Sequence, residues 1–366
     1  MKSDALTRDR SDALRGVACV GVVLYHMAHT TPGPSSPFYW LAGTFLGLGV
    51  PLFFMISAFA LASRYADGID SRQALARYAT RRVMRIYPLY LALLLCLLYR
   101  NGPTLSAGQV ALYASLLFAV VPALAEGLVW ASWSIGVEVL FYCAFPLILR
   151  AAPSTATLLA VAVTAHIVSL LLAPFTAPAF TGSPRYYAIA WHQYIPFFAL
   201  GLAAFRLQTP LIARGSRSTF GLVALMVGST VLAAVTLTLP GRPLGFSYVH
   251  LLIASTLPLF CLMLWIVTHP PVAVVNPLTL YLGKISYSIF LLHPYVVYKL
   301  KPVYLAIQRE VGAGGVAFAL SAAITFAVVL PLAALCYRWI EAPAIRLGAR
   351  WTRNKGLAGI PVPVLK

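Results

Sequence analysis

The residues in this chain that could do chemistry are two histidines and one glutamate inside apolar stretches. His26, Glu138 and His293 each lie several residues into a hydrophobic run, where an ionisable side chain is costly. Imidazole and carboxylate groups are common general bases and activators of nucleophiles in group-transfer enzymes. Arg15 precedes His26 by eleven residues, which at 100° each make three turns plus about 20°. The two side chains therefore share one helix face, roughly 16 Å apart along the axis.

Counting along each apolar run predicts the depth of the three ionisable groups in the membrane. His26 is about ten residues and His293 about twelve residues into outward-running spans, and Glu138 is about seven residues into an inward-running span. At 1.5 Å per residue, all three fall in the outer half of the bilayer. Two imidazoles and one carboxylate from distant parts of the sequence are thus predicted to lie at a similar depth.

Each of these groups also has a purely structural explanation. A buried histidine often only hydrogen-bonds a nearby carbonyl, and for His293 this explanation is as good as a functional one. For His26 the structural explanation does not account for Arg15 on the same helix face. Glu138 is the only carboxylate inside a predicted span, and neutral packing does not explain a charged group there. His26 and Glu138 are therefore the stronger catalytic candidates.

A second group of candidates is the basic stretch ALARYATRRVMRIYPLY, residues 74–90. Arg77, Arg81 and Arg85 recur every fourth residue and form one stripe on a helix, with Arg82 beside them. Anchoring of the cytoplasmic end of a span is one explanation for such arginines. Their density and their forked donors also fit recognition of a cytosolic polyanion through its phosphates.

The composition is typical of a polytopic membrane protein. The 366 residues are 60% hydrophobic and only 10% charged, whereas soluble domains carry about 25% charged residues. The net charge of +18 does not indicate nucleic-acid binding, because the basic residues lie between apolar spans, where positive-inside topology explains most of them. The five cysteines lie singly in apolar runs, so neither a disulfide framework nor a metal site is predicted.

The apolar runs predict an all-α bundle of about ten membrane-spanning helices with both termini cytoplasmic. We expect one membrane-embedded domain over residues 1–366, with spans from about 16 to 337 and a short basic cytoplasmic tail, 338–366. An eleventh run, 108–125, is predicted to be re-entrant or interfacial, because a further crossing would place the basic tail outside. The predicted spans are about 16–33, 41–63, 86–100, 131–149, 155–174, 191–205, 219–239, 248–268, 281–299 and 314–337.

Six short motifs follow one another from Asp12 to Pro343, over nearly the whole chain. They are Asp12, Arg15 and His26; Phe53, Phe54 and Ser57; Arg81, Arg82, Arg85, Ile86 and Pro88; Trp133, Ser134 and Glu138; Gly283, Ser286, Tyr287 and His293; and Ile340, Glu341 and Pro343. In this order they resemble the acyltransferase-3 family of integral membrane acyltransferases. Three positions depart from the family pattern: Ala58 replaces a glycine, Val139 a second glutamate and Ala342 an arginine.

The resemblance implies a membrane-bound O-acyltransferase of the inner (plasma) membrane. Family members move an acyl group, commonly acetyl from acetyl-CoA, to a hydroxyl of a cell-envelope or lipid-linked glycan. By this likeness Arg81, Arg82 and Arg85, with help from Arg15, hold the phosphates of cytosolic coenzyme A, and the pantetheine arm runs along the first helix. The expected partners are the glycan acceptor and the lipid bilayer, with no nucleic acid and no metal.

The likeness also implies roles for the remaining candidates. His26 is expected to act as general base on the acceptor hydroxyl, or as a nucleophile that forms an acyl-imidazole. Glu138 is expected to orient and polarise His26, and Arg15 completes the catalytic set. Trp133 is expected to line the acceptor pocket, with an interfacial aromatic belt as the equal alternative. The residues expected to bind substrate or support the site are Asp12, Ser57, Trp133, Ser134, Tyr287 and His293.

Other functions of such a chain remain to be weighed. A proton-coupled secondary transporter or a glycolipid translocator would also use buried histidine and glutamate, but the paired halves usual in transporters are not found in the sequence. A non-catalytic scaffold would not need ionisable groups at matched depth. Many family members carry an appended esterase-like domain, which the residues after 338 are too few to form. Transfer is therefore expected to need this chain alone or a separate extracytoplasmic partner.

Overall fold

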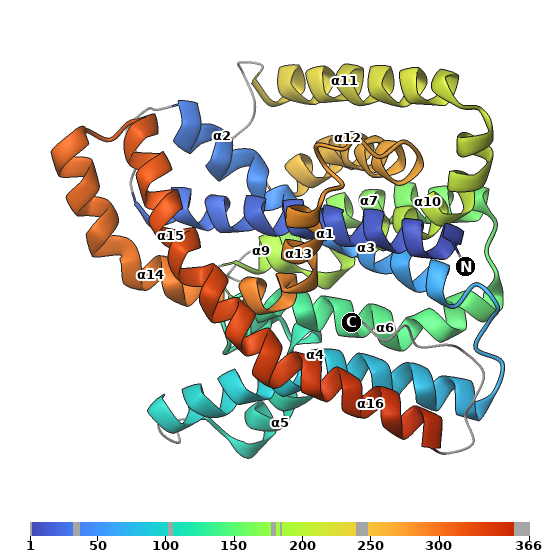
Figure 1. Ribbon diagram of the computed structural model, residues 1–366, viewed down its shortest axis with the longest axis horizontal. Coiled ribbons are helices and arrows are strands. Elements are labelled where there is room, and N and C mark those ends of the chain that lie inside the picture. Colours follow the sequence, from blue (N-terminus) through green and yellow to red (C-terminus); the bar gives the residue numbers. More distant parts are fainter. Residues whose placement is uncertain are drawn as a thin grey trace.

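The computed structural model of the chain is built from helices (Figure 1). It describes residues 2–31, 37–101, 105–176, 181–183, 185–238 and 248–354, and no strand occurs among them. The predicted all-α class is confirmed. Apolar runs become helices because hydrocarbon offers no hydrogen-bond partner, so each backbone polar group must be satisfied within its own helix.

Helices occupy all ten predicted spans. Among the described residues, seven helical stretches are long and apolar enough to cross a membrane, and they run from 37 to 64, 72 to 100, 132 to 151, 155 to 176, 186 to 213, 249 to 268 and 315 to 352. The long helices are α1 (Lys2–Thr30), α3 (Gly49–Arg64), α4 (Arg72–Asn101), α6 (Ser132–Ala151), α7 (Thr155–Leu172), α10 (Ile195–Ala213), α11 (Ser216–Thr238), α12 (Tyr248–Thr268), α14 (Ser286–Val311) and α15 (Gly315–Cys336). Helices α1 and α14, with 29 and 26 residues, are also long enough to cross, and these two carry the candidate histidines.

Short helices complete the described chain. They are α2 (Pro37–Phe45), η1 (Leu46–Leu48), α5 (Ala107–Ser115), η2 (Leu117–Val120), η3 (Pro122–Leu124), η4 (Ala173–Thr176), α9 (Tyr186–Ile189), η5 (Trp191–Tyr194), α13 (Pro277–Lys284), η6 (Tyr337–Glu341) and α16 (Ala342–Asn354). The run 108–125 is divided among α5, η2 and η3, because Leu116 ends α5 in the left-handed region at φ 63°. It forms no continuous span, in agreement with the topology derived from charge.

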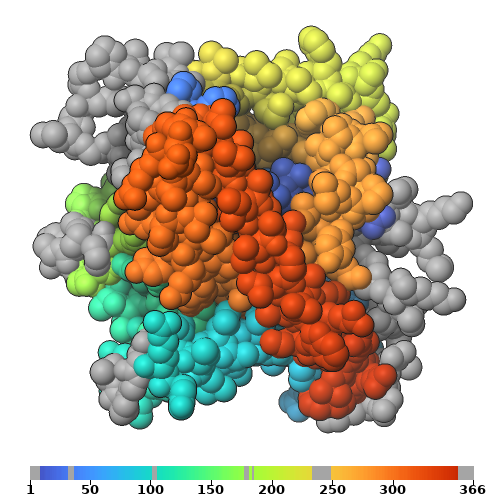
Figure 2. Space-filling model, turned by 60° about the vertical axis from the view of Figure 1, so that its left-hand side comes forward, coloured from blue at the N-terminus to red at the C-terminus, as the bar shows by residue number. Residues whose placement is uncertain are grey.

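Two predicted boundaries were wrong. The expected span 281–299 begins earlier and is broken at Ile285, which separates α13 from α14. The expected tail after residue 338 is helical up to Asn354, because a π-helical turn, η6, joins α15 to α16 without a break. Helix α16 lies along α4 (Figures 1 and 2), and Gly348 of α16 approaches Met84 of α4 closely.

Helix α1 lies in the middle of the bundle and packs against α3, α13 and α14 (Figure 1). Its approach to α13 is close enough to require glycine on both sides. A Cβ at Gly283 would lie 1.9 Å from the Asp12 carbonyl oxygen, and one at Gly16 would lie 2.3 Å from that of Thr279. The crossing of these helices therefore fixes the position of Asp12, and with it the start of the face that carries Arg15 and His26.

Candidate active site

The two candidate histidines contact each other, although 267 positions separate them in the sequence. His293 Nε2 lies 3.2 Å from His26 Nδ1, and the ring centroids are 4.8 Å apart. Each Nδ1 also lies against the carbonyl oxygen one turn earlier in its own helix: 2.9 Å from Val22 for His26 and 3.1 Å from Ile289 for His293. His293 is completely buried, whereas His26 is half-buried. The structure thus brings the two imidazoles to one depth.

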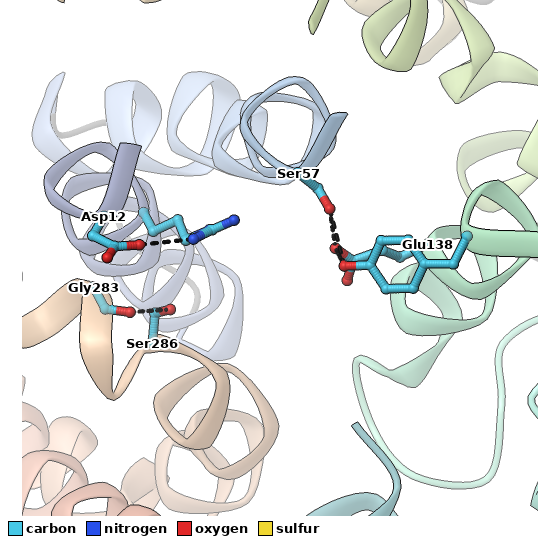
Figure 3. A network of polar contacts seen from close by, with 7 residues as sticks. Asp12, Ser57, Glu138, Gly283 and Ser286 are labelled. Atoms are coloured by element: carbon cyan, nitrogen blue, oxygen red, sulfur yellow. Dashed lines mark hydrogen bonds and ion pairs between the residues drawn. The ribbon is translucent and has the colours of Figure 1, made fainter. Parts of the chain in front are cut away.

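Glu138 lies in a different group of polar side chains. Its Oε1 accepts a hydrogen bond of 2.5 Å from the Ser57 hydroxyl and another of 2.5 Å from the Tyr142 hydroxyl (Figure 3). The hydroxyl oxygens of Ser57 and Tyr142 are themselves 3.0 Å apart. Among the residues that the structure describes, Glu138 makes no hydrogen bond to either histidine. The expected pairing of Glu138 with His26 is therefore not formed, and His293 takes the neighbouring position instead.

Glu138 and Tyr142 line a cavity between α1, α3, α4, α6 and α14, whereas neither histidine lines it. Arg15, Arg85 and Glu138 line it, so cations from two helices face a carboxylate from a third. Phe290 also lines this cavity, and its ring lies 5.7 Å from that of His293. The cavity therefore ends one aromatic ring away from the histidine pair.

Arg15 belongs to the cavity and not to the histidine pair. Its Nη1 donates a hydrogen bond of 2.7 Å to Asp12 Oδ1, one turn earlier on α1. In Figure 3, Asp12 lies on the side of Gly283 and Ser286, across from Ser57 and Glu138. The ion pair orients the guanidinium beside Asp12, so Arg15 can bind an anion in the cavity; in the described part of the chain it makes no hydrogen bond to His26.

The arginines of α4 lie in different surroundings, because the turn of the helix points them in different directions. Arg85 lines the cavity, and the guanidinium of Arg82 lies 5.5 Å from the ring centroid of Tyr142. Nη1 of Arg81 and Nε of Arg82 are buried and have no hydrogen-bond partner in the described part of the chain. Such donors favour an anion, because leaving a buried charged donor unpaired is costly.

Three other predicted residues have well-defined places. Ser134 and Tyr287 line the cavity; the Ser134 hydroxyl donates to the carbonyl of Ala131, and the Tyr287 hydroxyl donates to that of Ile86 at 2.6 Å. Trp133 is not among the residues that line this cavity, and its ring packs against that of Tyr194, with 5.3 Å between the ring centroids. Ser57, one of the expected supporting residues, is buried, and its hydroxyl donates to Glu138.

Sequence reasoning missed two residues of the site. Tyr142 follows Glu138 by one helical turn, so its place on the same face could have been read from the spacing. Arg64, at the end of α3, lies within electrostatic reach of Arg81 and Arg82, which only the folded arrangement of α3 and α4 reveals. Arg64 extends the basic group at this end of the bundle.

Comparison with known proteins decides the family of the chain. The sequence model described as an acyltransferase domain (acyltransferase-3) matches residues 8–338. The chain belongs to the acyltransferase-3 family. A protein of Acidianus two-tailed virus named "Putative acetyltransferase ORF330" is 25% identical over 326 residues, covering 87% of this chain and 88% of the viral protein. No solved structure matches the chain significantly.

Family membership and helical structure together identify a membrane acyltransferase. The family match covers α1 to α15, so it includes the cavity, the histidine pair and the arginines of α4. Among the described residues, no group of three or more histidine, cysteine, aspartate or glutamate side chains could hold a metal ion. The described site contains imidazole, carboxylate, hydroxyl and guanidinium groups.

Proposed function

We propose that this acyltransferase moves an acyl group, acetyl in the expected case, from cytosolic acyl-CoA to a hydroxyl of a cell-envelope or lipid-linked glycan. The observation that carries the proposal is the cavity, which is lined by Arg15, Arg85 and Phe290, the last of these in contact with His293. A donor with an anionic head and a long neutral arm ending in a thioester suits a cavity that has guanidinium groups in its wall and a histidine next to one of its lining rings. Arg15 and His26, roughly 16 Å apart on α1, define the length of the path.

The donor's phosphates bind at the basic end of α4. Arg81, Arg82 and Arg85 supply forked donors, and the unpartnered nitrogens of Arg81 and Arg82 support this role. Arg15, already oriented by Asp12, adds a further cation at the mouth of α1. The pantetheine arm lies in the cavity and presents the thioester at the histidine pair.

His26 performs the proton transfer. Its ring accepts the proton of the acceptor hydroxyl while the hydroxyl oxygen attacks the thioester carbonyl. The carbon–sulfur bond breaks, the thiolate leaves and takes that proton from the ring, and the products are the ester and free coenzyme A. In the second route, the His26 ring attacks the thioester first and coenzyme A leaves as the thiolate. The acceptor hydroxyl then displaces the imidazole from the acyl group, and its proton passes by way of the released ring to the thiolate. Glu138 contributes by accepting hydrogen bonds from Ser57 and from Tyr142, which lines the cavity with it.

The enzyme works across the plasma (inner) membrane, with both termini and the basic end of α4 cytoplasmic. The excess of arginine and lysine in the predicted inner segments supports this orientation. Single cysteines in place of the exposed residues Ser71 and Arg350 should be shielded from an impermeant thiol reagent in intact cells, and one in place of exposed Tyr187 should react. The native cysteines are first replaced. Labelling at position 350 in intact cells would mean that the C-terminal end lies outside, and it would contradict the proposed orientation.

The acceptor can be identified by comparing glycans. Mass spectrometry of cell-envelope glycans from a strain lacking the gene should show the loss of one acyl increment, whose mass also distinguishes acetyl from longer groups. Complementation with the wild-type gene should restore the increment, whereas a His26→Ala gene expressed at the same level should not. A separate extracytoplasmic partner is indicated if transfer stops at a lipid-linked intermediate. An unchanged glycan profile would contradict the proposed function.

A further inference from the structure

Two hydrogen bonds determine which ring nitrogens of the histidine pair carry protons. A carbonyl oxygen can only accept, so an Nδ1 that lies against one must carry the hydrogen when the ring is neutral. His26 Nδ1 lies 2.9 Å from the Val22 oxygen, and His293 Nδ1 lies 3.1 Å from the Ile289 oxygen. By this network both neutral rings are Nδ1–H tautomers, and each has its lone pair on Nε2.

These tautomers give the contact between the rings one direction. His293 Nε2 carries a lone pair and lies 3.2 Å from His26 Nδ1, which carries a hydrogen. His26 therefore donates through Nδ1 to two acceptors, the Val22 carbonyl and His293, and its own Nε2 remains unprotonated. The reverse tautomer of His26 would set the Nδ1 lone pair against the lone pairs of the Val22 carbonyl.

We propose that His293 is the positioning residue of this enzyme and that Nε2 of His26 is the reacting nitrogen. The inference rests on the proposed function, in which His26 accepts a proton or the acyl group. When Nε2 takes the hydroxyl proton, His26 becomes an imidazolium, and its Nδ1–H bond to His293 becomes charge-assisted and stronger. A neutral imidazole then stabilises the charged ring, as a carboxylate does in a Ser–His–Asp triad.

The surroundings of His293 suit a neutral acceptor. Its side chain is 0% exposed, and its ring packs against that of Phe290. An ionised carboxylate in such a place would need further partners to offset its loss of hydration, whereas imidazole is uncharged before the reaction. Glu138, the alternative orienting group, is already bonded to Ser57 and Tyr142.

The test compares His293→Gln with His293→Asn, which divide the functions of the two ring nitrogens. A glutamine amide reaches the position of Nε2 and can accept from His26, whereas an asparagine amide reaches only that of Nδ1. We expect His293→Gln to keep most of the wild-type kcat. His293→Asn and His293→Leu should lower kcat roughly 10–100-fold, the range seen when a group that orients a functional histidine is removed. The KM for acetyl-CoA should not change, because His293 does not line the cavity.

Activity is measured as transfer of labelled acetyl from acetyl-CoA to membranes of a strain lacking the enzyme. Equal losses in the glutamine and asparagine variants, or full activity of His293→Leu, would overturn the inference. Nitrogen-15 spectra of the ring-labelled wild-type protein give a second readout, and a proton on Nε2 of neutral His26 would also overturn it. If instead His26→Ala is active, the proposed function fails; if His26→Ala is inactive while the His293 variants are unaffected, only this inference fails.

Discussion

The arginine cluster and the histidine pair differ in how their polar groups are partnered. The arginine cluster, called the inner region below because the proposed orientation places it at the cytoplasmic side, combines guanidinium groups from α1 and α4 with a carboxylate from α6. Two of its buried donors, on Arg81 and Arg82, have no hydrogen-bond partner in the described part of the chain. The outer region contains two imidazoles whose hydrogen bonds are internal and directed. A site that binds a polyanion needs unpaired cations, whereas a site that moves one proton needs a neutral base in a defined tautomer. In the proposed reaction each region meets one of these needs.

The comparison also changes the interpretation of the glutamate. A carboxylate at the depth of a histidine suggests a triad, but the structure places Glu138 among Ser57, Tyr142 and the arginines. Depth alone says nothing about the direction in which a side chain points around its helix. We therefore expect substitutions in the inner region to change donor binding, and substitutions in the outer region to change turnover.

The largest expected effect belongs to the outer region. His26→Ala should lower kcat by about 10²–10⁴-fold, the range for loss of a general base, and by more if His26 forms an acyl intermediate. The KM for acetyl-CoA should change little, because the inner region is intact. The measurement is steady-state transfer of labelled acetyl with protein purified in lipid nanodiscs. Activity within a few-fold of wild type would mean that His26 takes no part in the chemical step and that its contact with His293 serves only packing.

The helix crossing that positions Arg15 gives the next effect. Gly283→Ala would place a methyl group against the Asp12 carbonyl, so α1 and α13 must separate, at a cost of about 1–3 kcal/mol as for other overpacked sites. Thermal unfolding in detergent should show a lowered Tm. Gly221→Ala in α11 is the matched control, because a Cβ there meets no atom within 4 Å. Equal stability of the two variants would mean that the close approach of α1 and α13 is not maintained in the membrane.

The arginines of α4 test the inner region directly. The triple variant Arg81→Lys, Arg82→Lys and Arg85→Lys keeps each positive charge, so insertion should be normal, but it removes the planar forks that hold phosphate through two bonds. Each charge-assisted bond contributes about 1.5–3 kcal/mol at most, so the KM for acetyl-CoA should rise about tenfold or more. Arg350→Lys, on the exposed face of α16, serves as the control. An unchanged KM would mean that these arginines only anchor the cytoplasmic end of the span.

The sequence predicted the helices well and the contacts only in part. Apolar length and charge bias located the ten spans, because the lipid environment dictates both. The spacing along α1 predicts that Arg15 and His26 share one face, and the similar depth predicted for His26 and His293 agrees with the contact between their rings. Which carboxylate or imidazole lies beside His26 depends on the rotation of α6 and α14 about their axes. Packing against neighbouring helices sets that rotation, and a single sequence does not encode it in any local pattern.

The same limit applies to the ends of the helices. The basic residues after 338 satisfy the positive-inside bias, which predicts a cytoplasmic tail there. Their helical continuation as α16 depends on contact with α4, where Gly348 permits the approach to Met84. Tyr142 shows the opposite case: its spacing from Glu138 was visible in the sequence, but tyrosine is so common in apolar helices that its type alone gave no signal.

The smallest expected effect is the one that most sharply separates the two regions. Tyr142→Phe removes one of the two hydroxyls bonded to Glu138 and keeps the ring beneath Arg82. Loss of one hydrogen bond of about 0.5–1.5 kcal/mol should raise the KM for acetyl-CoA by roughly two- to tenfold, because Glu138 loses one of the two bonds that hold it at the donor end. Ser57→Ala, which removes the other hydroxyl but leaves Tyr142 in place, should act in the same direction. A loss of kcat at unchanged KM in either variant would connect Glu138 to the histidine pair through a rearrangement in the bound state. The two regions would then have to be treated as one catalytic unit, with the carboxylate in the role that the family resemblance implies.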